Sequence, residues 1–127
     1  MPALHLDTNI LIGAGDPQNT LRIKLQQWLT QGDAIWVSAM TWSEFRCGPA
    51  SPDLIEGWRL LLGDHIVPID QPIAELGATL FNQTGRRSRS LPDCLIAATA
   101  LTAGAPLATL NHADFEPFFQ FGLILRS

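Results

Sequence analysis

The sequence is poor in the residues on which secreted and disordered proteins depend. Its 127 residues include only two cysteines, Cys47 and Cys94, which are too few for a disulfide framework. Charged residues make up only 16% of the chain and apolar residues 46%, a balance that excludes a disordered protein and favours a globular one. No basic stretch precedes the first apolar segment, so no signal peptide is expected. We therefore expect a single domain over residues 1–127, located in the cytoplasm.

A membrane span is also not expected, although residues 94–113 contain no Asp, Glu, Lys or Arg. Gly104 and Pro106 interrupt this run, and its threonine and asparagine side chains are too polar for lipid. A buried helix followed by a buried strand accounts for the same pattern.

Short apolar segments alternate with helical patterns along the whole chain. Strands are expected at residues 3–6, 34–37, 65–69, 106–109 and 122–125. Helices are expected over 17–31, 38–47 and 91–103, and two more open at 51–52 and at 70. This alternation predicts an α/β fold in three layers, an α/β/α sandwich with a central parallel sheet.

Four acidic residues fall where such a sheet places its functional groups. Asp7 ends the first strand, Glu44 lies in the helix after the second, and Asp114 closely follows the fourth. Asp93 lies in the first turn of the apolar helix at 91–103. Because the carboxyl ends of parallel strands share one edge of a sheet, we expect these four side chains to converge.

Each acid has a structural alternative. Asp7 and Asp114 could cap the short helices that follow them, and Glu44 has capping-box spacing from Thr41. Asp93 could be a first-turn acid favoured by the helix dipole. Four independent caps need not lie at one edge of a sheet, so the joint pattern favours a site over four separate caps.

A cluster of carboxylates needs a cation, because like charges cannot all ionise close together. Oxygen ligands without histidine or cysteine suit Mg²⁺, with Mn²⁺ as the alternative. The net charge of −4 agrees, since 12 acids face 8 basic residues. Without the four candidate ligands, 8 acids would balance the 8 basic residues.

These residues lie in segments that resemble a known family. "LDTNILI" at 6–12, "VSAMTWSEFRCG" at 37–48, "LPDCLIAATALTAGAPLATLNHADF" at 91–115 and the closing "GLILR" are similar to PIN-domain ribonucleases of the VapC toxin type. The resemblance covers nearly the whole chain. It implies an α/β/α sandwich and magnesium-dependent hydrolysis of RNA. It also implies a toxin with a cognate antitoxin, and we expect a homodimer.

The resemblance assigns the site residue by residue. It places the metal-binding and catalytic acids at Asp7, Glu44, Asp93 and Asp114. Many relatives carry an acid at the position of Asn111, which leaves Asn111 and Asp114 as candidates for the fourth ligand, with Asp114 preferred. The matching supporting positions are Thr8, Asn9, Thr109 and Asn111.

The only basic cluster is "GRRSRS", residues 85–90. Arg86, Arg87 and Arg89 could hold phosphates of the RNA backbone, or could form a solvated helix end. The helices that carry Trp42 and Trp58 are candidates for a groove that takes a helix of a protein partner.

Other functions fit less well. A haloacid-dehalogenase-type phosphatase needs a second aspartate where the chain has Asn9. A receiver-like phosphoacceptor needs a lysine on a late strand, and the only lysine is Lys24, in a predicted helix. A PIN-like fold that acts as a non-catalytic RNA- or protein-binding module stays the alternative, although the presence of all four acids favours an enzyme.

Overall fold

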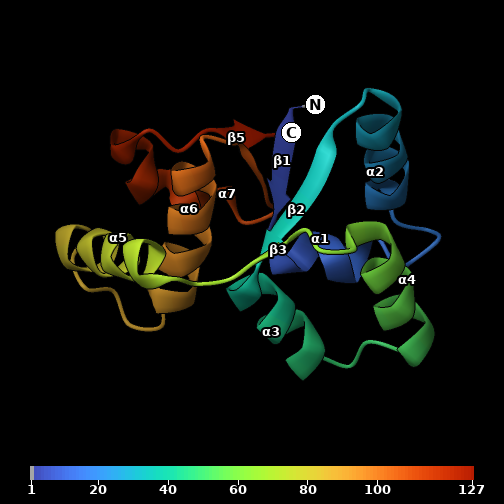
Figure 1. The fold of residues 1–127 in the computed structure, drawn as a ribbon, viewed down its shortest axis with the longest axis horizontal. Helices are drawn as coiled ribbons and strands as arrows, with labels where there is room; N and C mark the ends of the chain where they lie inside the picture. The colour runs from blue at the N-terminus through green and yellow to red at the C-terminus, as the bar shows by residue number, and fades with distance from the viewer. Residues whose placement is uncertain (1) are drawn as a thin grey trace.

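The computed structural model describes residues 2–127, which form a five-stranded sheet in the order β3-β2-β1-β4-β5. All neighbouring strands pair in parallel, as Figure 1 shows for the central pair. The predicted parallel α/β sandwich is thereby confirmed. The strands are β1 (Ala3–Leu6), β2 (Ala34–Ser38), β3 (Ile66–Val67), β4 (Leu107–Ala108) and β5 (Leu125–Arg126).

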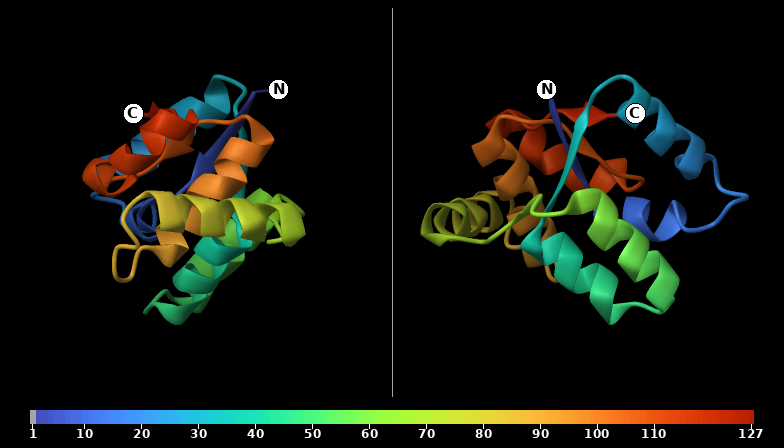
Figure 2. Two further views of the ribbon diagram at one scale, coloured as in Figure 1. Left: turned by 90° about the vertical axis from the view of Figure 1, so that its left-hand side faces the viewer. Right: turned by 45° about the vertical axis from the view of Figure 1, so that its right-hand side comes forward.

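Helices cover both faces of the sheet, with α1, α2 and α4 on one side and α5, α6 and α7 on the other (Figure 2). None of the helices within residues 2–127 combines the length and the apolar composition needed to cross a membrane. The helices are α1 (Thr8–Gly13), α2 (Thr20–Thr30), α3 (Ala39–Cys47), α4 (Pro52–Leu62), α5 (Gln71–Gln83), α6 (Leu91–Ala103), α7 (His112–Phe115) and the 3₁₀ helix η1 (Glu116–Phe121).

Alternating strand residues divide the core into two clusters. Leu4 and Leu6 of β1 pack with α1, α2 and α4, together with Ile35 and Val37 of β2. Leu107 of β4 belongs to the cluster formed with α5, α6 and α7. Ala108, the next residue of β4, belongs to the first cluster, because successive strand side chains point to opposite faces.

Helix boundaries follow their local signals. The side-chain oxygens of Ser38, Ser51 and Asp70 accept backbone N–H groups at the starts of α3, α4 and α5, where the sequence predicts these helices to open. The helix predicted over 17–31 begins later, at Thr20, because Asn19 caps it with a 3.0 Å bond from Leu21 N.

Some strand predictions are too long or displaced. The strand predicted over 65–69 covers only Ile66–Val67, and the one over 106–109 only Leu107–Ala108. The last strand is shifted from 122–125 to Leu125–Arg126, since Gly122, at a φ of 98°, ends the preceding 3₁₀ helix. A left-handed residue of this kind interrupts extended backbone.

The strand order places a topological switch point between β1 and β4. From β1 the chain runs outward to β2 and β3, and it then returns to add β4 and β5 on the other side. In open parallel sheets, ligands bind at the carboxyl ends of the strands beside such a point. Asp7 follows β1, and Thr109 follows β4, at this position.

Candidate active site

Asp7 is both the N-cap of α1 and the most buried carboxylate of the predicted site, at 5% exposure. Its Oδ1 accepts a 2.7 Å hydrogen bond from the backbone N of Thr8. Its Oδ2 accepts bonds of 2.7 Å from Thr109 Oγ1 and 3.2 Å from Asn9 Nδ2. Three donors therefore fix the carboxylate, and the capping role accounts for only one of them.

Thr109 and Asn9 join the two loops that follow β1 and β4. Asn9 Oδ1 accepts a 3.1 Å bond from Leu110 N, while Thr109 Oγ1 accepts a 3.0 Å bond from Asn111 N. The structure thus brings Thr8, Asn9 and Thr109 to Asp7. Asn111 contributes through its backbone, and its own side chain is exposed.

Glu44 approaches the same edge from α3. Its Oε1 accepts a 2.7 Å bond from the Thr8 hydroxyl. The capping-box alternative for Glu44 is wrong, because Ser38 caps α3 through a 2.9 Å bond from Thr41 N. Glu44 therefore lies beyond the first turn, where it caps nothing.

Asp93 lies in the first turn of α6, half-buried beside the other acids. Burial raises the pKa of its carboxyl to about 7, and the negative charges of Asp7, Asp114 and Glu44 contribute to the rise. An acid that served only the helix dipole would instead be stabilised in its charged form. The charge contributions to the pKa of Asp93, which add to the larger effect of burial, agree with the convergence of the four acids.

Asp7 and Asp114 also interact with each other electrostatically. Burial raises the pKa of Asp7, its hydrogen bonds oppose the rise, and the charge of Asp114 adds to it. Asp114 itself is exposed in α7 and does not cap η1, whose N-cap is Phe115. Asp114 is close enough to raise the pKa of both Asp7 and Asp93, so it stays the preferred candidate for the fourth ligand beside Asn111.

The donor set fits a hydrated divalent cation. Within residues 2–127, no group of three or more His, Cys, Asp or Glu side chains is arranged to hold a metal ion by itself. Mg²⁺, however, usually keeps several of its waters and takes one or two carboxylates directly. The oxygen-only donors suit this mode of binding, and a cation would relieve the repulsion that raises the pKa of Asp93.

The structure separates the three arginines that the sequence groups together. Arg87 is half-buried, and its Nη2 lies 3.5 Å from the carbonyl oxygen of Asp114. Arg86 is exposed and donates a 3.1 Å bond from its Nε to Asn82 Oδ1, back on α5. Arg89 is exposed.

A groove of about 560 Å³ lies between α2 and α4, away from the acids. Leu25 and Leu29 of α2 and Leu54, Trp58 and Leu61 of α4 supply its apolar lining. The helical spacing of these residues predicts apolar faces, but it does not show that two of the faces would meet in an open groove.

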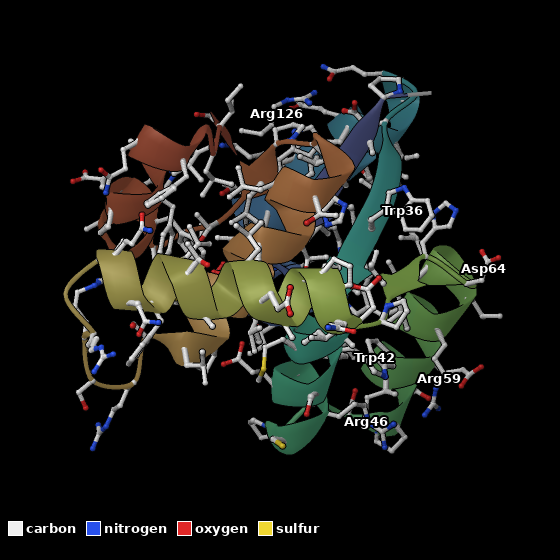
Figure 3. The ribbon with its side chains drawn as sticks, turned by 60° about the vertical axis from the view of Figure 1, so that its left-hand side comes forward. Trp36, Trp42, Arg46, Arg59, Asp64 and Arg126 are labelled. Carbon is white, nitrogen blue, oxygen red and sulfur yellow. The ribbon has the colours of Figure 1, made fainter. Side chains whose placement is uncertain are left out.

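The two tryptophans assigned to a partner groove differ in position. Trp58 borders the groove and donates from Nε1 to Leu11 O at 3.0 Å. Trp42 does not border it; it packs partly buried against the core, and Figure 3 shows it on α3 with Arg46. The Trp42 helix therefore does not line this groove, and its part in a partner surface stays a prediction.

Comparisons with known proteins agree with the fold. A family model described as PIN domain matches residues 4–116. A toxin–antitoxin complex from Klebsiella pneumoniae is 30% identical, with 89% of this chain and 90% of that chain covered and a TM-score of 0.72. The search of curated proteins found no match.

Two further solved structures share the fold at lower identity. VapBC-1 from nontypeable Haemophilus influenzae is 21% identical, covers 98% of this chain and 97% of that chain, and has a TM-score of 0.75. FitAB bound to an IR36 DNA fragment is 22% identical, covers 97% and 93%, and also has a TM-score of 0.75.

Proposed function

Because this chain belongs to the PIN domain family, we propose that it is a divalent-cation-dependent endoribonuclease and the toxin of a toxin–antitoxin pair. The observation that carries the proposal is the arrangement of the acids at this edge of the sheet: three donors fix Asp7, and Thr8 links it to Glu44. Burial and the charges of Asp7, Asp114 and Glu44 raise the pKa of Asp93 to about 7, in agreement with this arrangement. Repelling carboxylates held together in a fold are unfavourable without a cation, and a cation beside them suits phosphodiester chemistry.

Asp7 and Asp93 would hold Mg²⁺ or Mn²⁺ directly, with Glu44 and Asp114 acting through water. The bound cation would supply positive charge that offsets the carboxylates and the charge that develops on the phosphate during hydrolysis. Asp7 is suited to this role because Thr109 Oγ1, Asn9 Nδ2 and Thr8 N hold its oxygens in place.

Thr8 serves two acids at once. Its backbone N donates to Asp7, and its hydroxyl donates to Glu44. This arrangement holds the acid that follows β1 and the acid of α3 at a constant separation. Partners that orient metal ligands in this way are commonly as important as the ligands themselves.

The test of the nuclease is Asp93→Asn, with Glu75→Gln on the exposed face of α5 as a matched control. Each variant loses one carboxylate charge at nearly constant shape. We expect Asp93→Asn to abolish cleavage of RNA in Mg²⁺ while its circular dichroism stays that of the wild type, and Glu75→Gln to cleave normally. Undiminished cleavage by Asp93→Asn would contradict the mechanism. RNA binding without cleavage by the wild type would favour the non-catalytic alternative.

The antitoxin is proposed to occupy the groove between α2 and α4. Three observations support this assignment: similar solved structures are described as toxin–antitoxin or VapBC complexes, the groove combines an apolar stripe with the polar side chains of Arg22, Gln26 and Asp53, and its volume is about 560 Å³. An amphipathic helix is the partner that suits such a surface.

Co-expression with the protein encoded by the adjacent reading frame tests the pairing. We expect the two proteins to purify together and the complex to cleave RNA more slowly than the free chain. If the two proteins do not purify together, or if the complex cleaves RNA as fast as the free chain, the antitoxin assignment is contradicted. The nuclease assignment is then still decided by the Asp93→Asn experiment.

A further inference from the structure

Figure 1 shows the loop, residues 84–90, that joins α5 to α6, and the backbone of this segment is strained. Arg86 and Arg89 adopt φ angles of 51° and 65°, which L residues rarely adopt. Backbone bonds of 3.1 Å hold the segment, from Arg86 N to Phe81 O and from Ser90 N to Arg87 O. Strain of this kind persists where surrounding contacts impose it, and it is concentrated at functional sites.

Arg87, in the middle of this segment, faces the acid cluster. Its Nη2 lies 3.5 Å from the carbonyl oxygen of Asp114, and its guanidinium carbon lies 5.9 Å from the centre of the Phe118 ring. Arg86 turns the other way, toward Asn82. One strained segment therefore directs one guanidinium inward and leaves its neighbour in solvent.

The protein itself leaves this guanidinium with unused donors. Arg87 Nε is buried and has no acceptor within residues 2–127, and Arg87 forms no ion pair with any carboxylate of that range. Its 3.5 Å contact with Asp114 O places it beside the acids, and its positive charge accordingly lowers the pKa of Asp93. Because Nε is enclosed by protein, an external acceptor meets the terminal nitrogens of this half-buried side chain, and Nη2 makes only the 3.5 Å contact with Asp114 O.

We propose that Arg87 contacts a phosphate of the bound RNA and holds it beside Asp93 and Asp114; the proposal rests on the nuclease function proposed above. The planar fork of a guanidinium matches the oxygens of a phosphodiester. A phosphodiester has two non-bridging oxygens, so one can accept from Arg87 while the other faces the acid cluster and its cation. Phosphate contacts of this type position a nucleic acid without reading its sequence.

Matched substitutions test the assignment. Arg87→Gln and Arg86→Gln each remove one positive charge from the same segment, and Arg87→Lys keeps the charge but loses the fork. We expect Arg87→Gln to weaken binding of a single-stranded RNA, measured by fluorescence anisotropy in EDTA, about tenfold or more, and Arg86→Gln to weaken it less than about threefold. In Mg²⁺, the KM of Arg87→Gln should rise similarly while kcat changes less than about threefold. Arg87→Lys should recover part of the loss.

The Arg87 Nε–H gives a readout that a structural role would not move. Its NMR signal, assigned by its absence in Arg87→Lys, should shift when RNA is added in EDTA, and the Arg86 signal should not. Equal RNA affinity and KM for Arg87→Gln and Arg86→Gln, or an unmoved Arg87 signal at saturating RNA, would overturn the proposal. A shift with poly-glutamate alone would instead assign Arg87 to an acidic protein partner.

The nuclease and the Arg87 contact can fail separately. If the wild type binds RNA through Arg87 but does not cleave it in Mg²⁺ or Mn²⁺, the Arg87 contact is supported and the nuclease function is contradicted. If the wild type cleaves RNA and Arg87→Gln cleaves it equally well, the nuclease function is supported and the Arg87 contact is contradicted. If thermal melting shows Arg87→Gln to be unfolded, the comparison of Arg87→Lys with the wild type decides.

Discussion

At the scale of single residues, the site depends on hydroxyl and amide groups that orient its acids. Thr109 is buried at 4% exposure, and its Oγ1 both donates to Asp7 and accepts from Asn111 N and Asn9 Nδ2. A single hydroxyl therefore links the end of β1 to the end of β4. Such a group influences both the stability of the fold and the chemistry of the site.

Thr109→Val keeps the shape of the side chain and removes these bonds. We expect RNA cleavage to fall about 10–100-fold and the free energy of unfolding to fall by about 1–3 kcal/mol, because Asp7 loses its shortest side-chain donor. Thr79→Val, on the exposed face of α5, is the control and should change neither quantity appreciably. Cleavage rates and urea unfolding measure the two effects; normal cleavage by Thr109→Val would show that Asp7 needs no orientation.

His5 predicts a pH dependence of stability that is unrelated to catalysis. It is 2% exposed on β1, and burial lowers its pKa from 6.5 to about 4. Between these values the unfolded chain binds a proton that the folded chain does not, so stability is complete above pH 6.5 and is lost as the pH falls toward 4. The loss from this group is at most about 3 kcal/mol.

His5→Leu should remove that part of the pH dependence. Urea unfolding at pH 7 and at pH 4.5 measures how much free energy of unfolding the wild type and the variant each lose between the two pH values. Similar losses of stability in both proteins would assign the acid sensitivity to other groups.

At the scale of elements, α2 and α4 form a groove whose floor belongs to the core and whose edge is exposed. Leu61 borders the groove between them at 39% exposure, whereas the adjacent Leu60 is 79% exposed and does not border it. Consecutive residues of one helix point in different directions. A substitution at Leu61 therefore tests the groove, and the same substitution at Leu60 tests the rest of the α4 surface.

Leu61→Glu should weaken binding of the proposed antitoxin, because it places a charge among the apolar side chains of the groove. We expect affinity to fall about tenfold or more, while Leu60→Glu binds as the wild type does. Pull-down of the co-expressed partner, with thermal melting of each variant alone, makes the comparison. An equal loss of affinity in both variants would show that the partner does not bind specifically in this groove.

At the scale of the whole molecule, the charge balance reflects the site. The net charge of −4 equals the contribution of Asp7, Glu44, Asp93 and Asp114, since the remaining acids balance the basic residues. These acids lie on three separate helices and at the end of β1. They are therefore brought together, and repel one another, only in the folded chain. Anything that relieves the repulsion in the folded state alone should stabilise the whole chain.

A divalent cation should therefore raise the melting temperature. At a Mg²⁺ concentration ten times its Kd, the gain is about 1.4 kcal/mol, or several degrees for a domain of this size. Asp93→Asn should melt higher than the wild type in EDTA, because one repelling charge is gone, and should gain less from Mg²⁺. An equal shift in the two proteins would place the cation elsewhere.

Local signals in the sequence determined most of the secondary structure and the choice of residues for the candidate site. Ser38, Ser51 and Asp70 open their helices, and the apolar helix at Leu91–Ala103 has its predicted ends, because caps and periodicity act within a few residues. The carboxylates could be named because acids rarely follow buried strands without a reason.

Only the tertiary structure decided how these parts meet. Thr109 bonds Asp7 across 102 residues, and Thr8 bonds Glu44 across 36, so neither contact leaves a local trace in the sequence. The strand order, the groove between α2 and α4 and the inward turn of Arg87 are likewise set by packing between distant segments. Periodicity shows which face of an element is apolar, whereas the partner of that face depends on the whole chain.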